Sequence, residues 1–240
     1  MVYSRKKWVC EGYHGLGRLY TCLQLLVLLS LSGTAFGQEE AWDRVHQETG
    51  ITIETRPVAG SAIRAFRAVA TIEADPEAVL ALMDDPRVCP LWIYGCRESE
   101  ILETRDFYHR STYQINDMPW PAEDRDLAMD VAISELADGT FELILTNAPD
   151  RIPKTEYVRV PVAEGRYRLT RLAPGRTRLE WIQHMEPGGY LPDWLVNQLL
   201  LDIPLVSLRQ LRELLADPKS PFRQWRLERN NEGRVIGWAQ

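Results

Sequence analysis

The sequence contains few of the residues, and none of the motifs, on which most enzyme sites depend. It has four histidines and four cysteines in 240 residues. It contains no Gly-x-Ser-x-Gly elbow, no His-Glu-x-x-His helix, no phosphate-binding loop and no glycine fingerprint for dinucleotides. We therefore predict a protein that is not an enzyme and has no cofactor or metal site. No repeat or low-complexity segment is present, which favours a single folded domain.

The sequence also has fewer basic than acidic residues. The chain has 28 Lys and Arg residues against 34 Asp and Glu, a net charge of −6. Residues 1–37 hold four of the basic residues and one acidic residue, so residues 38–240 carry 24 basic against 33 acidic side chains, a net charge of −9. This balance disfavours nucleic acid and strong adhesion to anionic lipid surfaces. It does not disfavour an apolar ligand held inside the protein.

The sequence lacks an apolar run long enough for a typical membrane span. The run Leu19–Leu31 has about thirteen residues, whereas a span needs roughly twenty. Basic residues precede it, and Ala35-Phe36-Gly37 fits the small-x-small pattern of a signal-peptidase site. We interpret residues 1–37 as a signal peptide and residues 38–240 as one domain, exported to the periplasm. An uncleaved anchor is the alternative, because the basic section is long for a signal.

Two cysteines remain after this cleavage, Cys89 and Cys96, with six residues between them. In an oxidising compartment, an even pair at short range often forms a disulfide. We therefore predict a Cys89–Cys96 disulfide. The alternative is two buried free thiols, since cysteine is among the most buried residue types. A metal site is disfavoured because no histidine lies within twelve residues of either cysteine.

Hydrophobic periodicity and turn residues predict an α+β protein. Asp75-Pro76 is a typical helix start, with Asp75 as the N-cap. Asp138-Gly139 and Pro174-Gly175 are typical of hairpin turns. The expected helices are Ala41–Thr49, Pro76–Met83, a turn at Val88–Trp92 and Pro192–Ala216, kinked at Pro204. The expected strands are Ile51–Arg56, Ile63–Glu73, Glu98–Thr104, Phe107–Ile115 (joined to the preceding strand by a turn at Arg105-Asp106), 126–134, Phe141–Leu145, Tyr157–Val162, Arg166–Leu172 and Arg176–Met185.

Two strands each carry one mainly apolar face. One face holds Leu127, Met129, Val131 and Ile133; the other strand aligns Leu179, Trp181, Gln183 and Met185. Pro187-Gly188-Gly189 then breaks the strand, and an apolar helix begins near Pro192. This order predicts a helix that packs as a lid across a curved sheet.

Two motifs resemble a known family. Pro119-Trp120-Pro121 followed by Arg125-Asp126, then Pro187-Gly188-Gly189-x-x-Pro192-x-Trp194-Leu195-Val196-Asn197, resemble the START (StAR-related lipid-transfer) domain in its bacterial form. The order of elements agrees over roughly residues 40–216. The resemblance implies a helix-grip fold, in which a long C-terminal helix closes a U-shaped antiparallel sheet over an apolar tunnel. It also implies binding or transfer of a lipid or other hydrophobic small molecule, with transient membrane contact, but no particular ligand.

Candidate ligand-contacting residues come from these elements. A tryptophan between two prolines is a stiff wedge suited to a cavity mouth, and Arg125 or its neighbour Asp126 is expected to enter the interior. Packing in the core, or an outer ion pair with Asp124 or Glu123, explains the same residues without a ligand. The predicted ligand-binding residues are Tyr113, Trp120, Arg125, Met129, Val131, Trp181, Gln183, Trp194, Leu195 and Leu199.

Two other classes of function stay open. Helix-grip folds include cyclases and hydrolases, and His109 and Ser111 lie two apart on one strand face as a weak base-and-nucleophile pattern. A protein-interaction module is the third class. If a ligand enters a tunnel, we expect the mouth to be bordered by the turn Pro187–Leu191 or by the hairpin at Asp138-Gly139, because local motion exposes least apolar surface.

Overall fold

The computed structural model describes residues 41–239, without the side chain of Asp193. The predicted signal peptide, residues 1–37, lies outside the described residues. None of the helices within residues 41–239 is both long and apolar enough to cross a membrane.

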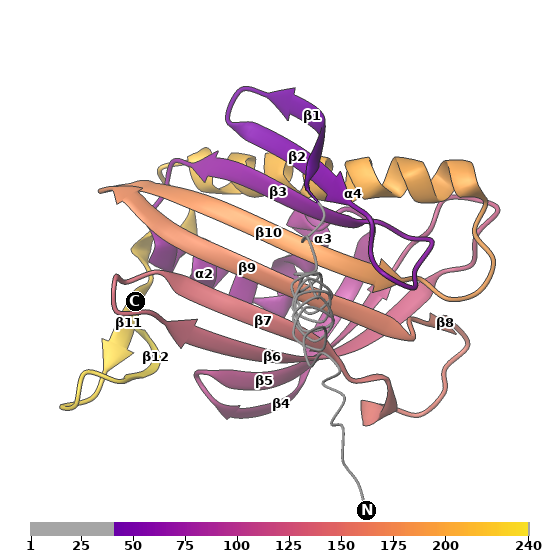
Figure 1. The fold of residues 1–240 in the computed structure, drawn as a ribbon. Coiled ribbons are helices and arrows are strands. Elements are labelled where there is room, and N and C mark those ends of the chain that lie inside the picture. The colour runs from indigo at the N-terminus through magenta and orange to yellow at the C-terminus, as the bar shows by residue number, and fades with distance from the viewer. Residues whose placement is uncertain (1–40, 240) are drawn as a thin grey trace, which may run out of the picture. The chain divides into compact units, whose positions relative to one another are not determined.

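One large, curved sheet dominates the molecule (Figure 1). All neighbouring strands along it are antiparallel, and the short β8 (Val158–Arg159) adds to β6 in parallel. In spatial order the other strands are β1 (Asp43–Glu48), β2 (Ile51–Arg56), β3 (Ala65–Ile72), β10 (Arg176–Glu186), β9 (Val162–Ala173), β7 (Phe141–Asn147), β6 (Arg125–Glu135), β5 (His109–Asn116) and β4 (Cys96–Asp106).

The helices gather in two places. The long α4 (Asp193–Ala216) runs along the end of the sheet formed by β2 and β3 (Figure 1). The chain between β3 and β4 forms α2 and α3, which lie behind the sheet in this view. After α4, a hairpin of β11 and β12 ends the described chain. The remaining elements are α2 (Pro76–Asp84), α3 (Cys89–Trp92), three 3₁₀ turns at Pro86–Val88, Pro149–Arg151 and Pro221–Gln224, β11 (Arg226–Arg229) and β12 (Val235–Ala239).

The core lies between the sheet and α4. Trp181 of β10 stacks on Tyr167 of β9 with ring centroids 5.1 Å apart. Phe66 of β3 packs edge-on against Trp181, with ring centroids 4.9 Å apart. Opposite these rings, α4 contributes leucines at helical spacing, so one stripe of the helix is buried. The buried leucines of this stripe are Leu205, Leu208, Leu211 and Leu215. The predicted lid over a sheet is therefore confirmed, with Pro204 inside the helix.

The start of α2 shows how the sequence fixes a helix to the sheet. Pro76 opens the helix, as predicted. Asp75 precedes it, but its side chain makes no capping hydrogen bond. Its carboxylate instead accepts a hydrogen bond from the backbone N–H of Gly175, at 2.9 Å, and pairs with Arg171. The residue therefore joins α2 to the β9–β10 turn rather than serving only its own helix.

The predicted helix Ala41–Thr49 is wrong. These residues form the edge strand β1, which pairs with β2 through the turn at Gly50, where φ is 73°. Because only one side of an edge strand is covered, most of β1 is exposed and its periodicity is weak. Pairing with β2 decided its conformation, as tertiary context often does.

Two boundaries also differ from expectation. The β4–β5 turn lies at Phe107-Tyr108, two residues later than predicted, because the Asp106 carboxylate accepts the Tyr108 N–H at 2.8 Å and Phe107 is buried in the core. The predicted strand Tyr157–Val162 contains only β8, two residues long, before β9 begins.

Candidate functional site

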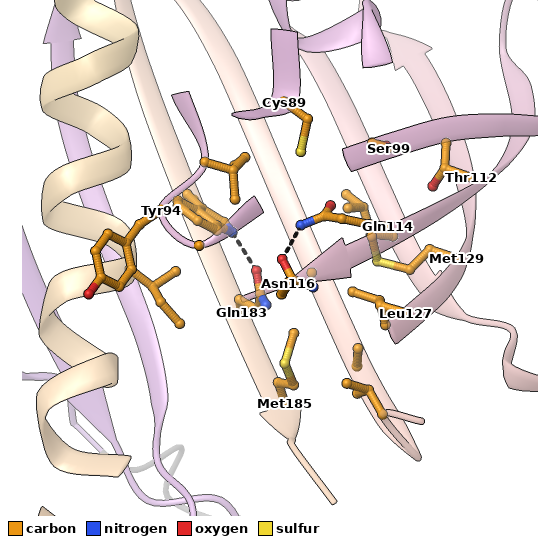
Figure 2. Close-up of a pocket in the computed structure, with 18 of the residues that line it drawn as sticks. Cys89, Tyr94, Ser99, Thr112, Gln114, Asn116, Leu127, Met129, Gln183 and Met185 are labelled. Atoms are coloured by element: carbon orange, nitrogen blue, oxygen red, sulfur yellow. Dashed lines mark hydrogen bonds between the residues drawn. The ribbon is translucent and has the colours of Figure 1, made fainter. Parts of the chain in front are cut away.

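A cavity of about 240 Å³ lies between the sheet, α3 and the first half of α4. Its lining is mostly apolar. The side chains from β5, β6 and β10 point into it in Figure 2, beside the loop that carries Tyr94. The principal apolar lining residues are Trp92, Ile93, Leu127, Met129, Val131, Ile133, Leu143, Leu145, Tyr167, Trp181, Met185, Val196, Leu199, Leu200 and Ile203.

The alternating faces of β6 and β10 form two walls of this cavity. Of the residues predicted to contact a ligand, six line it: Arg125, Met129, Val131, Trp181, Gln183 and Leu199. Trp181 donates its indole N–H to the side-chain oxygen of Gln183 at 2.9 Å, which orients the amide (Figure 2). Their contact with a ligand stays a prediction.

The other four predicted residues do not line the cavity. Leu195 is fully buried in the protein. Trp120 and Trp194 are exposed, at 89% and 57%, and Tyr113 points away on the outer face of β5. The wedge predicted from Pro-Trp-Pro therefore faces solvent instead of covering the cavity.

Arg125 joins the two segments that border one end of the cavity, which we call the mouth. These segments are residues 117–125 and the turn 187–191, and the residues of them that line the cavity are Asp117, Met118, Arg125, Pro187 and Leu191. The Arg125 guanidinium donates to the carbonyl of Gly188 at 3.1 Å and to that of Glu123. Only 3% of this residue is exposed, and its burial lowers the pKa of the guanidinium. Two turns were predicted to border the mouth. The Pro187–Leu191 turn lines the cavity, and the hairpin at Asp138-Gly139 does not.

The turn requires glycine at this point. Gly188 and Gly189 have φ values of 66° and 60°, which other residues rarely adopt. A Cβ on Gly188 would lie 3.1 Å from the carbonyl oxygen of Arg159, so the two segments approach too closely for a side chain. The Pro-Gly-Gly motif therefore permits a tight contact at the mouth.

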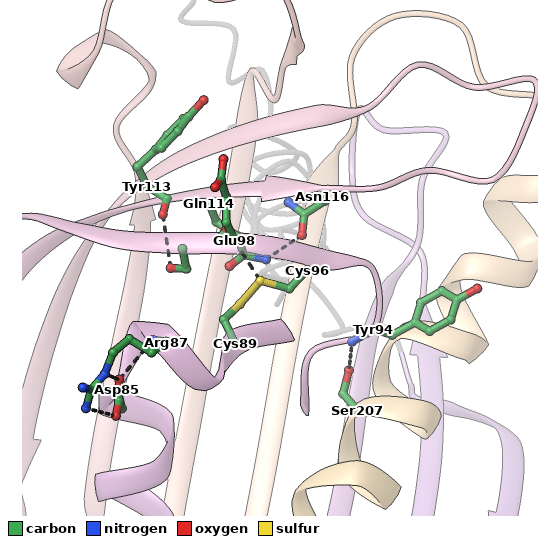
Figure 3. Close-up of a disulfide and its surroundings, with 11 residues drawn as sticks. Asp85, Arg87, Cys89, Tyr94, Cys96, Glu98, Tyr113, Gln114, Asn116 and Ser207 are labelled. Atoms are coloured by element: carbon green, nitrogen blue, oxygen red, sulfur yellow. Dashed lines mark hydrogen bonds and ion pairs between the residues drawn. A yellow bond between two sulfur atoms is a disulfide. The ribbon is translucent and has the colours of Figure 1, made fainter. Parts of the chain in front are cut away.

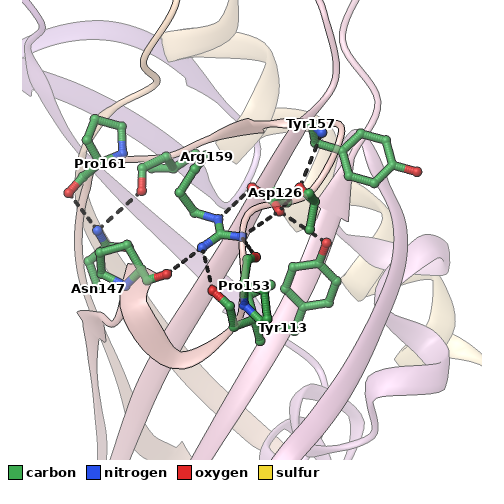
Figure 4. Close-up of polar contacts among 11 residues, drawn as sticks. Tyr113, Asp126, Asn147, Pro153, Tyr157, Arg159 and Pro161 are labelled. Carbon is green, nitrogen blue, oxygen red and sulfur yellow. Dashed lines mark hydrogen bonds and ion pairs between the residues drawn. The ribbon is translucent and has the colours of Figure 1, made fainter.

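Asp126 anchors the outside of the same region (Figure 4). It is fully buried and accepts two hydrogen bonds from Arg159, at 2.7 and 3.0 Å, and one from Thr155 at 2.6 Å. Burial alone would raise the pKa of Asp126, but these hydrogen bonds outweigh it and lower the pKa. Tyr113 donates to the same carboxylate at 3.2 Å; burial and this negative charge raise the pKa of Tyr113 to about 12.

The end of the cavity away from the mouth, the inner end, holds a buried ion pair. Arg110 of β5 pairs with Asp84, the last residue of α2, and donates to the carbonyl of Phe107 at 2.6 Å. Both line the cavity, with side chains 8% and 14% exposed. Burial lowers the pKa of Arg110 to about 10, so it keeps its charge at neutral pH.

Sequence reasoning missed this pair and the polar wall beside it. The inward residues of β5 after Arg110 are Thr112, Gln114 and Asn116, and Gln114 donates to Asn116 at 2.5 Å (Figure 2). Both faces of β5 are polar, so its inward face could not be identified from apolar alternation. The inward face of β5 could have been inferred from its antiparallel pairing with β6, because the apolar residues of β6 identify the inward face of that strand.

The Cys89–Cys96 disulfide is confirmed (Figure 3), with Cα atoms 6.0 Å apart, within the usual range. It joins the first residues of α3 and β4. The enclosed loop carries Tyr94, whose backbone N–H donates to Ser207 of α4 at 2.9 Å. The disulfide therefore holds a cavity-lining loop against the closing helix.

His109 and Ser111 belong to the outer face of β5 and have different partners. Ser111 donates to Asp130 at 2.6 Å, while the His109 ring lies 2.9 Å from an Asp106 oxygen. Within residues 41–239 no hydrogen bond joins the two side chains, so the base-and-nucleophile pattern is not assembled. In the same residues no three His, Cys, Asp or Glu side chains gather as metal ligands.

The curved sheet and the long C-terminal helix that closes it over an apolar cavity define the helix-grip fold. The family model of the START domain matches residues 27–219, so the chain belongs to the START-domain family. The expected fold is confirmed.

Comparison with individual proteins agrees. An uncharacterised protein of Pseudomonas aeruginosa is 33% identical over 186 residues, covering 77% of this chain and 91% of that protein. The crystal structure of a STAR-related lipid transfer protein fragment from Xanthomonas axonopodis has a TM-score of 0.68 and 28% identity, covering 73% of this chain and 98% of that one. Human StAR-related lipid transfer protein 5 shares the fold, with a TM-score of 0.65, 18% identity and coverage of 83% and 96%.

Proposed function

We propose that this protein binds one lipid or other hydrophobic small molecule in the cavity beneath α4 and transfers it between membranes or proteins. The observation that carries the proposal is the apolar cavity of about 240 Å³. The similarity to the STAR-related lipid transfer protein of Xanthomonas axonopodis also supports it. Apolar walls favour an apolar ligand by removing its surface from water. The polar groups of β5, together with Gln183, give such a ligand a fixed orientation.

The test is to purify the protein from its own host and analyse it by native mass spectrometry, followed by solvent extraction. We expect a bound component of one defined mass that extracts as a lipid. A second measurement is the fluorescence of N-phenyl-1-naphthylamine, an uncharged apolar probe, which should rise on binding and fall when the extracted lipid is added. A chain that carries no lipid and does not bind the probe would refute the proposal.

We also propose that the mouth makes transient contact with a membrane during transfer. Trp120 and Tyr190, exposed at 89% and 82%, lie on the two segments that Arg125 joins, and Trp194, exposed at 57%, follows them in the first turn of α4. Tryptophan and tyrosine favour the membrane–water interface, where their rings are partly in contact with lipid. The net negative charge of the domain is consistent with an uncharged rather than an anionic surface.

The combined change Trp120→Ala and Trp194→Ala should reduce binding to phosphatidylcholine vesicles and slow transfer between them by about tenfold or more. The matched control is Leu172→Ala, which removes an exposed apolar side chain on β9, in the strand end that leads to the β9–β10 turn. Equal transfer by both variants would contradict the membrane-contact proposal.

A further inference from the structure

The hairpin β11–β12 lies beyond residue 219, where the family match ends, yet it is packed into the domain. Val235 is 2% exposed, and its backbone N–H donates to the hydroxyl of Tyr108 at 3.0 Å. Trp238 meets Phe107 edge-on, with ring centroids 5.6 Å apart. Just before the hairpin, Arg223 donates to the carbonyl of Leu215 at 2.6 Å, at the end of α4. The hairpin is therefore a fixed outer layer behind the inner end of the cavity.

One hydrogen bond connects the hairpin to the cavity wall. The Trp238 indole N–H donates to one oxygen of Asp84 at 2.8 Å, and the other oxygen of Asp84 pairs with Arg110. Asp84 is the last residue of α2, where the helix dipole disfavours a negative charge. Two donors on different elements therefore hold a carboxylate at a position that the helix alone would not favour.

The hydrogen bond from Trp238 to Asp84 affects the charge that a ligand meets at the inner end of the cavity. Arg110 is buried and charged, and alone it would attract an anionic head group. Asp84, held in place by Trp238, neutralises it. The paired side chains then present no net charge to a ligand at this end of the cavity.

We propose that the C-terminal hairpin is a specificity element: through Trp238, a positioning residue, it keeps Asp84 on Arg110, so that the cavity selects an uncharged apolar ligand over an anionic one. This proposal rests on the proposed function and adds the class of ligand.

The experiment uses two probes that share one ring system. N-phenyl-1-naphthylamine is uncharged, and 8-anilinonaphthalene-1-sulfonate differs from it by a sulfonate. Dissociation constants for both are measured on the full chain, and their ratio reports preference for the anion independently of apolar binding. The variants are Trp238→Phe, which keeps an aromatic ring but removes the N–H, and Asp84→Asn, which removes the negative charge. The matched control is Trp225→Phe, a second indole of the same region, which packs against Trp238 at 6.1 Å.

The wild-type protein should prefer the uncharged probe. Trp238→Phe should shift the ratio toward the sulfonate by about two- to tenfold, the effect of one hydrogen bond, because Asp84 is held less firmly on Arg110. Asp84→Asn should shift it further in the same direction, by more than tenfold, and Trp238→Phe should add little in that background, since the two act as one unit. Trp225→Phe should leave the ratio unchanged. Thermal melts identify any variant that has lost its fold.

The outcomes separate the two proposals. If the uncharged probe does not bind the wild-type protein, the proposed function fails and this inference fails with it. If that probe binds but Trp238→Phe leaves the ratio at the wild-type value, the hairpin does not set selectivity, whatever Asp84→Asn does. If Asp84→Asn does not fold, the comparison of Trp238→Phe with Trp225→Phe still decides.

Discussion

At the scale of single residues, two neighbours on β6 hold the two sides of the mouth. Arg125 and Asp126 point to opposite faces because strand side chains alternate. The first reaches the Gly188 carbonyl on the cavity side, and the second binds Arg159 on the outside. The Arg-Asp motif therefore has a structural role. Arg125 binds the turn before α4, and Asp126 binds the connection between β7 and β9.

Asp126→Asn should destabilise the protein by about 3 kcal/mol, because it leaves the partly buried Arg159 without its charge partner. The pKa of Asp126 is lowered in the folded state, so its contribution to stability is full at neutral pH and is lost as pH falls below the ordinary carboxyl range. Urea unfolding between about pH 7 and pH 3 should show this loss in the wild type and a smaller pH dependence in the variant. Glu100→Gln, at an exposed site on β4, is the control; equal destabilisation by both changes would contradict the assignment.

Val131 and Ala132 offer a matched test of the cavity, since they are adjacent but face opposite ways. Val131 lines the cavity, whereas Ala132 is exposed. Val131→Trp should fill free volume and weaken binding of N-phenyl-1-naphthylamine by about tenfold or more, while Ala132→Trp should leave it unchanged. Probe titration and thermal melts give the comparison. Undiminished binding by a folded Val131→Trp protein would mean that the probe occupies another site.

At the scale of elements, the strongly periodic segments were predictable and the others were not. The faces of β6 and β10 and the apolar α4 followed from spacing alone, because each buries one side. The edge strand β1 and the polar β5 carry no such contrast. Asp84 and Arg110 come from different elements, and their pairing depends on how α2 meets β5, which no local pattern encodes. The motif residues Trp120 and Trp194 were recognisable, but their exposure depends on loop geometry.

We propose that the mouth is the gate of the cavity, so that its motion controls ligand exchange. Arg125→Met removes the hydrogen bond to Gly188 and should speed exchange several-fold. A disulfide between Gly189→Cys and Val158→Cys should slow exchange strongly, since a Cβ on Gly189 would lie 3.3 Å from the Val158 side chain. The cysteine at Gly189 also costs stability, because φ there is 60°. Stopped-flow displacement of a bound fluorescent lipid measures both rates. The single Gly189→Cys variant is the control for backbone strain; unchanged exchange in the cross-linked protein would refute gating at this turn.

At the scale of the whole molecule, the disulfide bears on both the closing helix and the predicted signal peptide. Cys89–Cys96 lies beside the contact between Tyr94 and Ser207, so it stabilises the attachment of α4 near the cavity. Such a bond persists in an oxidising compartment, which is consistent with the proposed export and periplasmic location.

Protein recovered from the periplasm of its host should therefore begin near Gln38 by N-terminal sequencing and contain no free thiol without reduction. The disulfide closes a loop of about eight residues, for which loop entropy predicts roughly 2–3 kcal/mol of stability. Cys89→Ser with Cys96→Ser should lose about that amount in urea unfolding, and reductant should lower the wild type to the same level while leaving the double variant unchanged. On chain that begins near Gln38, two free thiols without reduction would contradict the disulfide. An intact N-terminus on chain found in the membrane fraction would contradict the cleaved leader. The thiol count is therefore made on chain shown to begin near Gln38, because an uncleaved chain would add the thiols of Cys10 and Cys22.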